Sequence, residues 1–171
     1  MKQSYRELIE MLSTSEGWAQ AYPLLLEAGH AAIPDVISGL KHLDPKIRKW
    51  CASFLDHHGT TEAIPAMVRA LDDASAEVRR HAVHAIGCQP CKPDPLPVDV
   101  AAQLIRKANQ DESIRVRRAA VHLLGLQAHD RRIVLALEEI VKSEADSKLV
   151  SNARFALVEQ RKESRGDTRR E

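Results

Sequence analysis

The segment IPDVISGLKHLDPKIRKWCASFLDHHG, residues 33–59, gives the strongest indication of the fold, because the chain repeats its pattern further on. The pattern returns as IPAMVRALDDASAEVRRHAVHAIG at residues 64–87 and as VDVAAQLIRKANQDESIRVRRAAVHLLG at residues 98–125. The first two copies align an Ile-Pro pair, a central Leu and an aliphatic-Arg pair. The third copy lies further along because CQPCKPDPLP, residues 88–97, is inserted before it. Self-similarity of this kind is typical of repeat proteins.

Each copy predicts a hairpin of two helices. Pro34 and Pro65 suit the first turn of a helix, where the missing N–H of proline is not required. A turn with Asp follows, and a second helix then opens at the aliphatic-Arg pair. That helix ends at Gly59, Gly87 or Gly125, which we expect to be left-handed C-terminal caps. One hairpin cannot bury its own apolar face, whereas a stack of hairpins can.

The composition suits helices packed closely on one another. The chain has 171 residues, of which 44% are hydrophobic and only 4% aromatic, and its formal net charge is +1. A balanced charge gives no general attraction to nucleic acid or to an anionic membrane. The sequence shows no signal peptide and no apolar run long enough to span a bilayer, and its three cysteines do not suggest a secreted disulfide framework. We therefore expect a cytoplasmic protein without membrane contact.

The copies resemble HEAT repeats, in particular the short HEAT-like repeats of phycobilisome lyases. The segments that carry the resemblance are IPDVISGLKHLDPKIRKWCASFL, IPAMVRALDDASAEVRRHAVHAIG and ESIRVRRAAVHLLG, within residues 30–126. The resemblance implies an all-α fold, a right-handed α-α superhelix of about five hairpins. We expect one domain over residues 1–160, with an irregular N-terminal hairpin at 1–28 and a degenerate closing hairpin at 130–160. Residues 161–171 are charged, and we expect them to be a disordered tail.

The resemblance also implies a role for the aliphatic-Arg pairs. In HEAT-like repeats the second helices line the concave face, and the first Arg of each pair bonds to the turn Asp, so that stacking makes a ladder. The residues expected in this ladder are Arg48, Arg79 and Arg117, with Asp44, Asp73 and Asp111.

The second members of these pairs and nearby residues predict a cationic stripe on the concave face. A stripe of this kind could receive an acidic peptide or a phosphate backbone. We expect a protein or peptide partner, and nucleic-acid binding is the alternative, which the balanced charge and low aromatic content disfavour. The other interpretation is that these basic residues form an ordinary solvent-exposed face, on which nearby acidic residues neutralise their charge. The residues predicted to bind the partner are Lys49, Arg80, His84, Arg115, Arg118 and His122.

The segment HAVHAIGCQPC contains candidate zinc ligands. His81, His84 and Cys88 fall on one face of a helix, within an arc of about 60°. Cys91 follows in the inserted loop, and His57 aligns with Cys88 one hairpin earlier. Imidazoles and thiolates in a tetrahedral set suit zinc. The alternatives are histidines and thiols without a metal, or a Cys88–Cys91 disulfide.

Three familiar enzyme motifs are absent from the sequence. The chain has no His-Glu dipeptide of the kind that binds iron in HEAT-like hydroxylases, no G-x-x-x-x-G-K-[ST] loop and no G-x-S-x-G motif. The aromatic residues are spread along the sequence, which favours core filling over a base-stacking platform; they include Trp18, Tyr22, Trp50, Phe54 and Phe155. We therefore expect a non-catalytic interaction or scaffold module that requires no cofactor. A zinc-binding HEAT-like protein is the second alternative.

Overall fold

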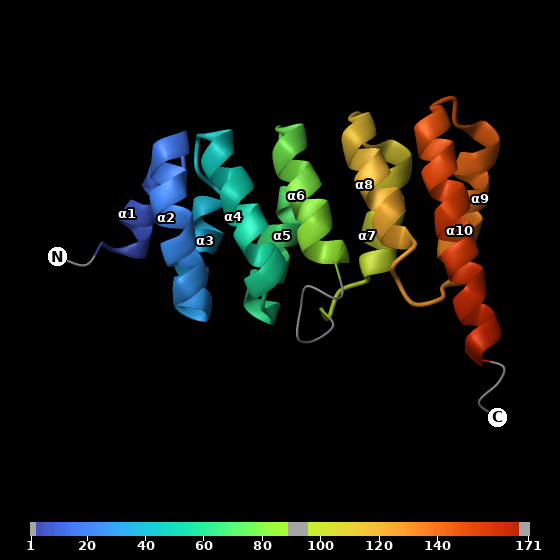
Figure 1. Ribbon diagram of the computed structural model, residues 1–171, viewed down its shortest axis with the longest axis horizontal. Helices are drawn as coiled ribbons and strands as arrows, with labels where there is room; N and C mark the ends of the chain where they lie inside the picture. Colours follow the sequence, from blue (N-terminus) through green and yellow to red (C-terminus); the bar gives the residue numbers. More distant parts are fainter. Residues whose placement is uncertain (1–2, 89–95, 168–171) are drawn as a thin grey trace. The chain divides into compact units, whose positions relative to one another are not determined.

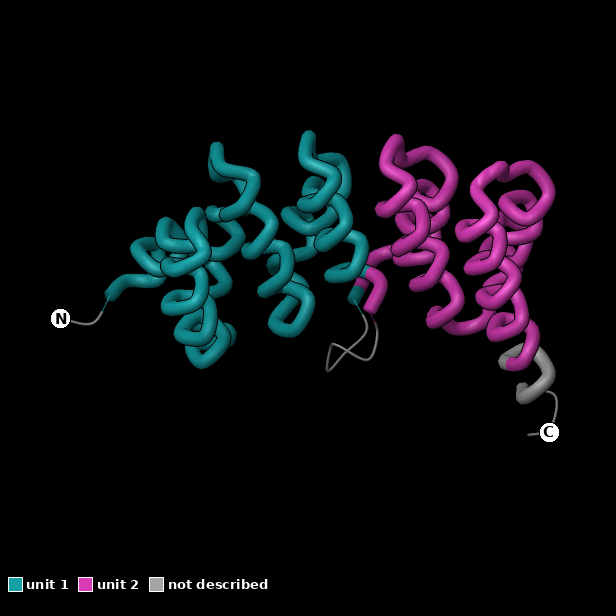
Figure 2. Tube along the Cα trace, turned by 45° about the horizontal axis from the view of Figure 1, so that its top comes forward, with its two compact units in different colours: residues 1–86, 90–96 teal, residues 87–89, 97–171 magenta. Residues whose placement is uncertain are grey.

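The computed structural model describes residues 3–88 and 96–167. All regular secondary structure within these residues is helical, as the sequence predicts (Figure 1). The chain divides into two compact units (Figure 2). The first contains residues 1–86 and 90–96, and the second contains residues 87–89 and 97–171. The division falls at the inserted segment that interrupts the repeat.

The first unit is built from helical hairpins in two layers. In Figure 1, α2, α4 and α6 lie side by side, with α3 and α5 behind them. The last residue of α6 belongs to the second unit. The elements are α1 (Tyr5–Met11), α2 (Ser15–Ala28), η1 (Gly29–Ala32), α3 (Ile33–Gly39), α4 (Pro45–His58), η2 (Thr61–Ala63), α5 (Ile64–Ala70) and α6 (Ala76–Gly87).

Local sequence signals explain where these helices begin. Pro34 and Pro65 occupy the first turns of α3 and α5, as predicted. Pro45 is the first residue of α4, and the side chain of Asp44 accepts a hydrogen bond from the Lys46 N–H at 2.8 Å. An Asp at this position satisfies one of the backbone N–H groups that a helix start leaves without a partner.

Aliphatic side chains from both layers fill the core of the first unit. Fully burying one large aliphatic or aromatic side chain stabilises a fold by about 1.5–3 kcal/mol relative to its exposure. The largest of these buried residues are Leu12, Leu25, Ile47, Phe54, Leu55, Met67, Leu71 and Ile86.

The second unit consists of two further hairpins. They are α7 (Val100–Gln110) with α8 (Ile114–Leu124), and α9 (Arg131–Ser143) with α10 (Ser147–Asp167). Asp99 and Asp130 cap the starts of α7 and α9 with their carboxylates. The last helix continues to Asp167 and so enters the segment 161–171 that the sequence predicts to be a tail. The core residues include Leu104, Val116, Leu123, Leu124, Ile133, Leu137 and Leu149.

Two buried glutamines satisfy the helix ends of the second unit. The Gln160 side-chain amide donates to the carbonyl oxygens of Leu124 and Gln127, at 3.1 and 2.7 Å. The Gln127 amide donates in turn to the carbonyl oxygens of Gly87 and Leu123, at 2.8 and 2.9 Å. The last carbonyls of a helix have no intrahelical donor, and these amides supply one.

The left-handed caps predicted at Gly59, Gly87 and Gly125 are wrong. Within the described residues the glycine with a positive φ is Gly29, at 55°. The requirement for glycine is steric instead, because a Cβ on Gly125 would lie 3.0 Å from the Cα and Cβ atoms of Ala156. Glycine here lets the end of α8 approach the backbone of α10.

Candidate functional site

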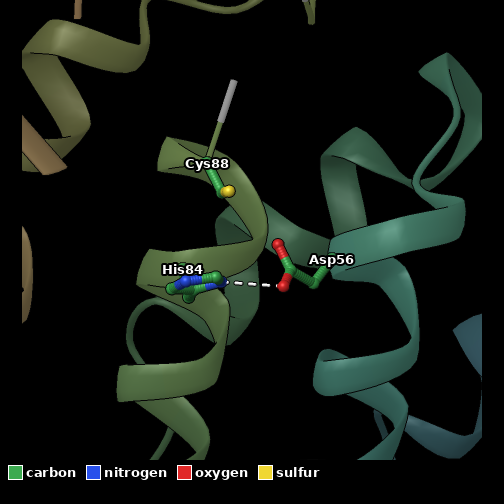
Figure 3. A group of neighbouring side chains, drawn as sticks. All are labelled: Asp56, His84 and Cys88. Carbon is green, nitrogen blue, oxygen red and sulfur yellow. Dashed lines mark hydrogen bonds and ion pairs between the residues drawn. The ribbon is translucent and has the colours of Figure 1, made fainter. Parts of the chain in front are cut away.

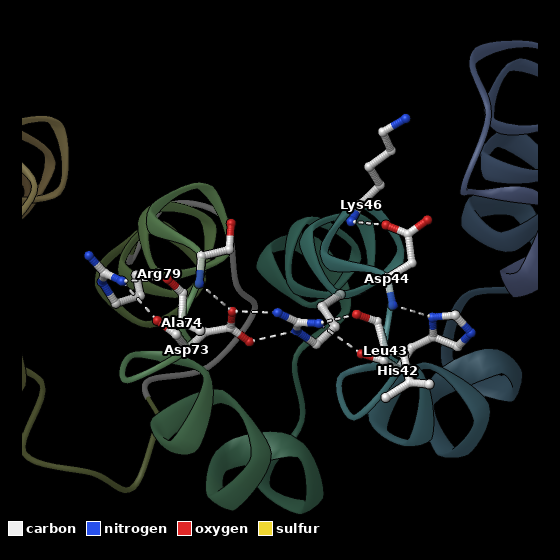
Figure 4. Close-up of polar contacts among 9 residues, drawn as sticks. His42, Leu43, Asp44, Lys46, Asp73, Ala74 and Arg79 are labelled. Carbon is white, nitrogen blue, oxygen red and sulfur yellow. Dashed lines mark hydrogen bonds and ion pairs between the residues drawn. The ribbon is translucent and has the colours of Figure 1, made fainter.

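The ladder of arginines connects successive hairpins (Figure 4). Arg48 on α4 donates from Nε and Nη2 to the carboxylate of Asp73, at 2.7 and 2.8 Å. Its Nη1 donates to the carbonyl oxygens of His42 and Leu43, at 2.8 and 2.9 Å. The predicted pairing of Arg48 with Asp44 is therefore wrong, since Arg48 reaches the turn of the following hairpin and Asp44 caps its own helix.

The second unit repeats this forward connection. Arg117 pairs with Glu144 at 2.7 Å, and Arg118 pairs with Asp146 at 2.6 Å. Both acids lie in the turn of the next hairpin, whereas the sequence predicted that Arg117 would bond to Asp111. Arg118 was predicted to bind a partner, and its guanidinium is already held by two hydrogen bonds to the Asp146 carboxylate.

Aromatic rings gather on the second helices of the first unit. We call Trp18, Tyr22, Trp50 and His81 the aromatic row. The centroid of the Trp50 ring lies 4.8 Å from that of Trp18, 5.4 Å from that of Tyr22 and 6.2 Å from that of His81. All four side chains are half-buried. The row therefore forms part of the surface of α2, α4 and α6, although the sequence favoured core filling.

Lys49 and Arg80 lie on the aromatic row. The Lys49 Nζ is 3.9 Å from the centroid of the Trp50 ring, a cation–π contact. The Arg80 Nη2 is 3.1 Å from Nε2 of His81 and 3.1 Å from a carboxylate oxygen of Glu77. Both residues were predicted to bind a partner, and the structure places them beside rings that the prediction did not include.

The histidine of the row is neutral at physiological pH. Burial lowers the pKa of His81 to about 4, and the nearby cations Arg80 and Lys49 contribute to the shift. A neutral imidazole can accept a hydrogen bond, so the Nε2 atom of His81 takes one from Arg80. His81 thereby holds the guanidinium of Arg80 against the row.

The candidate metal ligands are only partly brought together (Figure 3). The Nδ1 atom of His84 is 2.8 Å from Oδ2 of Asp56. Asp56, His84 and Cys88 each place one possible ligand atom within 4.8 Å of the other two. Cys88 directly follows α6 and is disulfide-bonded. The ring of His81 lies against Trp50 instead, and Cys91 lies outside the described residues.

Asp56 is the member of this group that the sequence analysis missed. It lies at the end of α4, one hairpin before His84, and its side chain is only 10% exposed. His57, the predicted fifth ligand, has Nε2 at 3.7 Å from Oδ2 of Asp56 and a side chain that is 58% exposed. The alignment of His57 with Cys88 indicated that this helix end would lie beside Cys88, and the neighbouring carboxylate could have been found from it.

The remaining predicted partner-binding residues lie on α8 in the second unit. Arg115 and His122 are both exposed there. The position equivalent to Trp50 and His81 in that helix is Ala119. The aromatic row is therefore a feature of the first unit.

Comparison with known proteins agrees with this architecture. Residues 33–100 match a family model described as HEAT repeats. The chain therefore contains HEAT repeats within residues 33–100. A comparison with curated proteins found no match. No helix in the described part of the chain combines the length and the hydropathy needed to cross a bilayer.

Solved structures with the same fold include natural and designed solenoids. One is a chain from the complex of CpcE and CpcF of phycocyanin lyase from Nostoc sp. PCC7120, with 19% identity, a TM-score of 0.74, and 89% of this chain and 96% of that chain covered. Another is an engineered protein with 19% identity and a TM-score of 0.56, covering 93% and 80%. A third comes from designed armadillo repeat proteins for modular peptide recognition, with 18% identity, a TM-score of 0.53, and 91% and 82% covered. At these identities the likeness establishes the fold.

Proposed function

We propose that this HEAT-repeat chain is a non-catalytic scaffold that binds a protein or peptide segment on the surface of α2, α4 and α6. The observation that carries the proposal is the aromatic row with Lys49 and Arg80 upon it. Tryptophan, tyrosine and arginine dominate the binding energy of protein interfaces, because they offer large contact areas together with directional polar groups.

The ladder of arginines supports this role by keeping the surface in one shape. Arg48 joins α4 to the turn that precedes α6, so the helices that carry Trp50 and His81 are connected by a bidentate ion pair. A preorganised surface loses less conformational entropy when it binds. One structural neighbour is an armadillo repeat protein designed for modular peptide recognition, and another comes from a protein complex, which supports the same kind of function.

Selection from a displayed random peptide library tests the proposal. The bait is the full chain, and each enriched peptide is then titrated against three variants. Trp50→Leu removes the central ring, and Lys49→Glu with Arg80→Glu reverses the cations. Arg69→Glu is the control on the other layer, where Arg69 is exposed on α5. Circular dichroism confirms that each variant remains folded.

The expected result is a set of peptides that bind the wild type and Arg69→Glu equally. Their affinity should fall by about tenfold or more in Trp50→Leu and in the double charge variant, as expected for a hot-spot residue. An absence of enriched peptides, or peptides that bind both surface variants as well as the wild type, would overturn the proposal.

Zinc binding is a second candidate function, favoured by the grouping of Asp56, His84 and Cys88 within 4.8 Å. Because Cys88 is disulfide-bonded, only the chain reduced by a thiol reagent would offer its thiolate to a metal. Elemental analysis of protein purified with reductant and without chelator is the test. About one zinc per chain, lost in Asp56→Asn and His84→Ala but not in His122→Ala, would support the site. A zinc content well below one per chain would overturn the proposed zinc site.

A further inference from the structure

We infer that the segment bound by the aromatic row is an acidic peptide with an apolar side chain placed between carboxylates. The inference rests on the proposed function and adds the chemistry of the ligand. The apolar side chain would pack on the exposed parts of Trp18 and Trp50, and the flanking carboxylates would pair with Lys49 and Arg80.

The charges around the row favour an anionic ligand. The charged groups that act on Lys49 are Lys46 and Arg80, which are positive, and Glu77, which is negative. Glu77 lies 3.1 Å from Arg80 and pairs with it, so the net charge around Lys49 remains positive. The contact of Lys49 is with the Trp50 ring at 3.9 Å, and its side chain is half-buried there. A carboxylate brought to this site would meet a partly desolvated cation, where an ion pair is stronger than in bulk water.

The packing of the rings favours a peptide over a nucleic acid. Base stacking requires an open aromatic face, and Trp50 is flanked by Trp18 at 4.8 Å, by Tyr22 at 5.4 Å and by Lys49. What the row offers are the exposed parts of half-buried rings. Contacts of that kind suit an aliphatic or aromatic side chain of a peptide better than a flat base.

A tryptophan N–H in the row is also consistent with an extended chain as the ligand. The Nε1 atom of Trp18 is buried and has no hydrogen-bond acceptor in the described part of the chain. A buried indole N–H normally finds an acceptor, and leaving it without one costs about 1–3 kcal/mol. A peptide carries a carbonyl at every residue, and one of them could accept this hydrogen bond only if the Trp18 indole turned toward the bound chain.

The extent of the row sets the length of the segment. Three helices packed about 8–10 Å apart span about 16–20 Å between their axes. An extended chain rises about 3.3 Å per residue, so about five or six residues cross the row. The probes can therefore be short synthetic peptides.

Fluorescence anisotropy with labelled peptides is the test, and it uses the full chain. The probe is an acidic peptide with a central Leu. The comparison peptides replace its Glu and Asp by Gln and Asn, its Leu by Ser, or its acids by Lys, and a labelled oligothymidine is measured alongside them. The protein variants are the double variant Lys49→Glu with Arg80→Glu, and the control Arg69→Glu.

The acidic peptide should bind at least about tenfold more tightly than its amide and Ser versions. The double charge variant should lose the acidic peptide and gain the lysine peptide, while Arg69→Glu behaves as the wild type. Equal binding of acidic and amide peptides would overturn the inference. Tighter binding of oligothymidine, with a steep salt dependence, would overturn it in favour of nucleic acid.

The two proposals fail in different ways. Selected peptides that need Trp50 but carry neutral or basic residues would overturn the acidic ligand and leave the proposed function intact. A library that yields no Trp50-dependent peptide would overturn both.

Discussion

Arg48 on α4 and Asp73 in the turn before α6 form a bidentate ion pair with N–O distances of 2.7 and 2.8 Å. Their side chains are only 15% and 11% exposed. Arg48 also binds two carbonyl groups of its own turn, so a single side chain fixes two successive turns of the stack. This pair is a direct polar connection between the hairpins that carry Trp50 and His81.

Substitution of Asp73 by Asn should destabilise the chain. The guanidinium of Arg48 would lose its carboxylate while remaining largely buried, and we expect a loss of about 1–3 kcal/mol in the free energy of unfolding. Urea denaturation measures the change. The control is Glu159→Gln in the Lys162–Glu159 pair, whose lysine side chain is 66% exposed, and it should change stability by less than about 0.5 kcal/mol. Equal effects of the two substitutions would contradict the assigned role of Arg48.

The Asp73 contribution should disappear in acid. Burial raises the pKa of Asp73, but hydrogen bonds from Arg48 and from the Ser75 N–H outweigh burial, so its pKa lies below the usual 3.8. A carboxyl with a lowered folded-state pKa contributes full stability above its unfolded pKa and loses it as the pH falls through the folded value. The stability difference between wild type and Asp73→Asn should therefore be constant near neutral pH and narrow below 3.8. A stability difference between wild type and Asp73→Asn that widens in acid would contradict the lowered pKa of Asp73.

Substitution of Gly125 by Ala should also be costly. The added Cβ would lie 3.0 Å from the Cα and Cβ atoms of Ala156, so α8 and α10 would have to separate slightly. Overpacking of this kind costs about 1–3 kcal/mol. Thermal unfolding provides the measurement, with Ser151→Ala at an exposed position of α10 as the control. If Gly125→Ala proved as stable as that control, the close approach of the two helices would be disproved.

Cys51 should be unreactive in the folded protein. Its side chain is buried, and burial raises the pKa of the thiol to about 12. Because the thiolate is the nucleophile, alkylation at neutral pH should be negligible without unfolding and complete in denaturant. Mass spectrometry of the peptide that contains Cys51 distinguishes the two states. Rapid alkylation of this peptide under native conditions would contradict the packing of α4.

The helices could be predicted from the sequence because their determinants are local. The Ile-Pro pairs of residues 33–34 and 64–65 mark the starts of helices, and the aliphatic pattern of each copy marks a buried face. The similarity of the copies then predicted the stack. The actual role of Gly125 could not be predicted, since its steric requirement depends on a residue in the next hairpin.

The candidate site was predicted only in part, for the same reason. Lys49 and Arg80 followed from their place beside the repeated arginines, but the rings beneath them come from three different helices. Trp50 and His81 occupy equivalent positions in successive repeats, and this equivalence was the sequence signal for the aromatic row. The contact between Trp18 and Trp50, which completes the row, is seen only in the structure. Asp56 was missed because its partner, His84, belongs to the following hairpin.

Tryptophan fluorescence measures directly whether an acidic peptide binds at the aromatic row. The chain contains two tryptophans, Trp18 and Trp50, and both belong to the aromatic row, so all tryptophan emission reports on this surface. Titration with an acidic peptide that lacks tryptophan should give a saturable change in emission in the wild type and in Arg69→Glu. The change should be absent in the double variant Lys49→Glu with Arg80→Glu. Binding of that peptide, confirmed by anisotropy, with no change in tryptophan emission would show that the peptide binds elsewhere and that the aromatic row is not its binding surface.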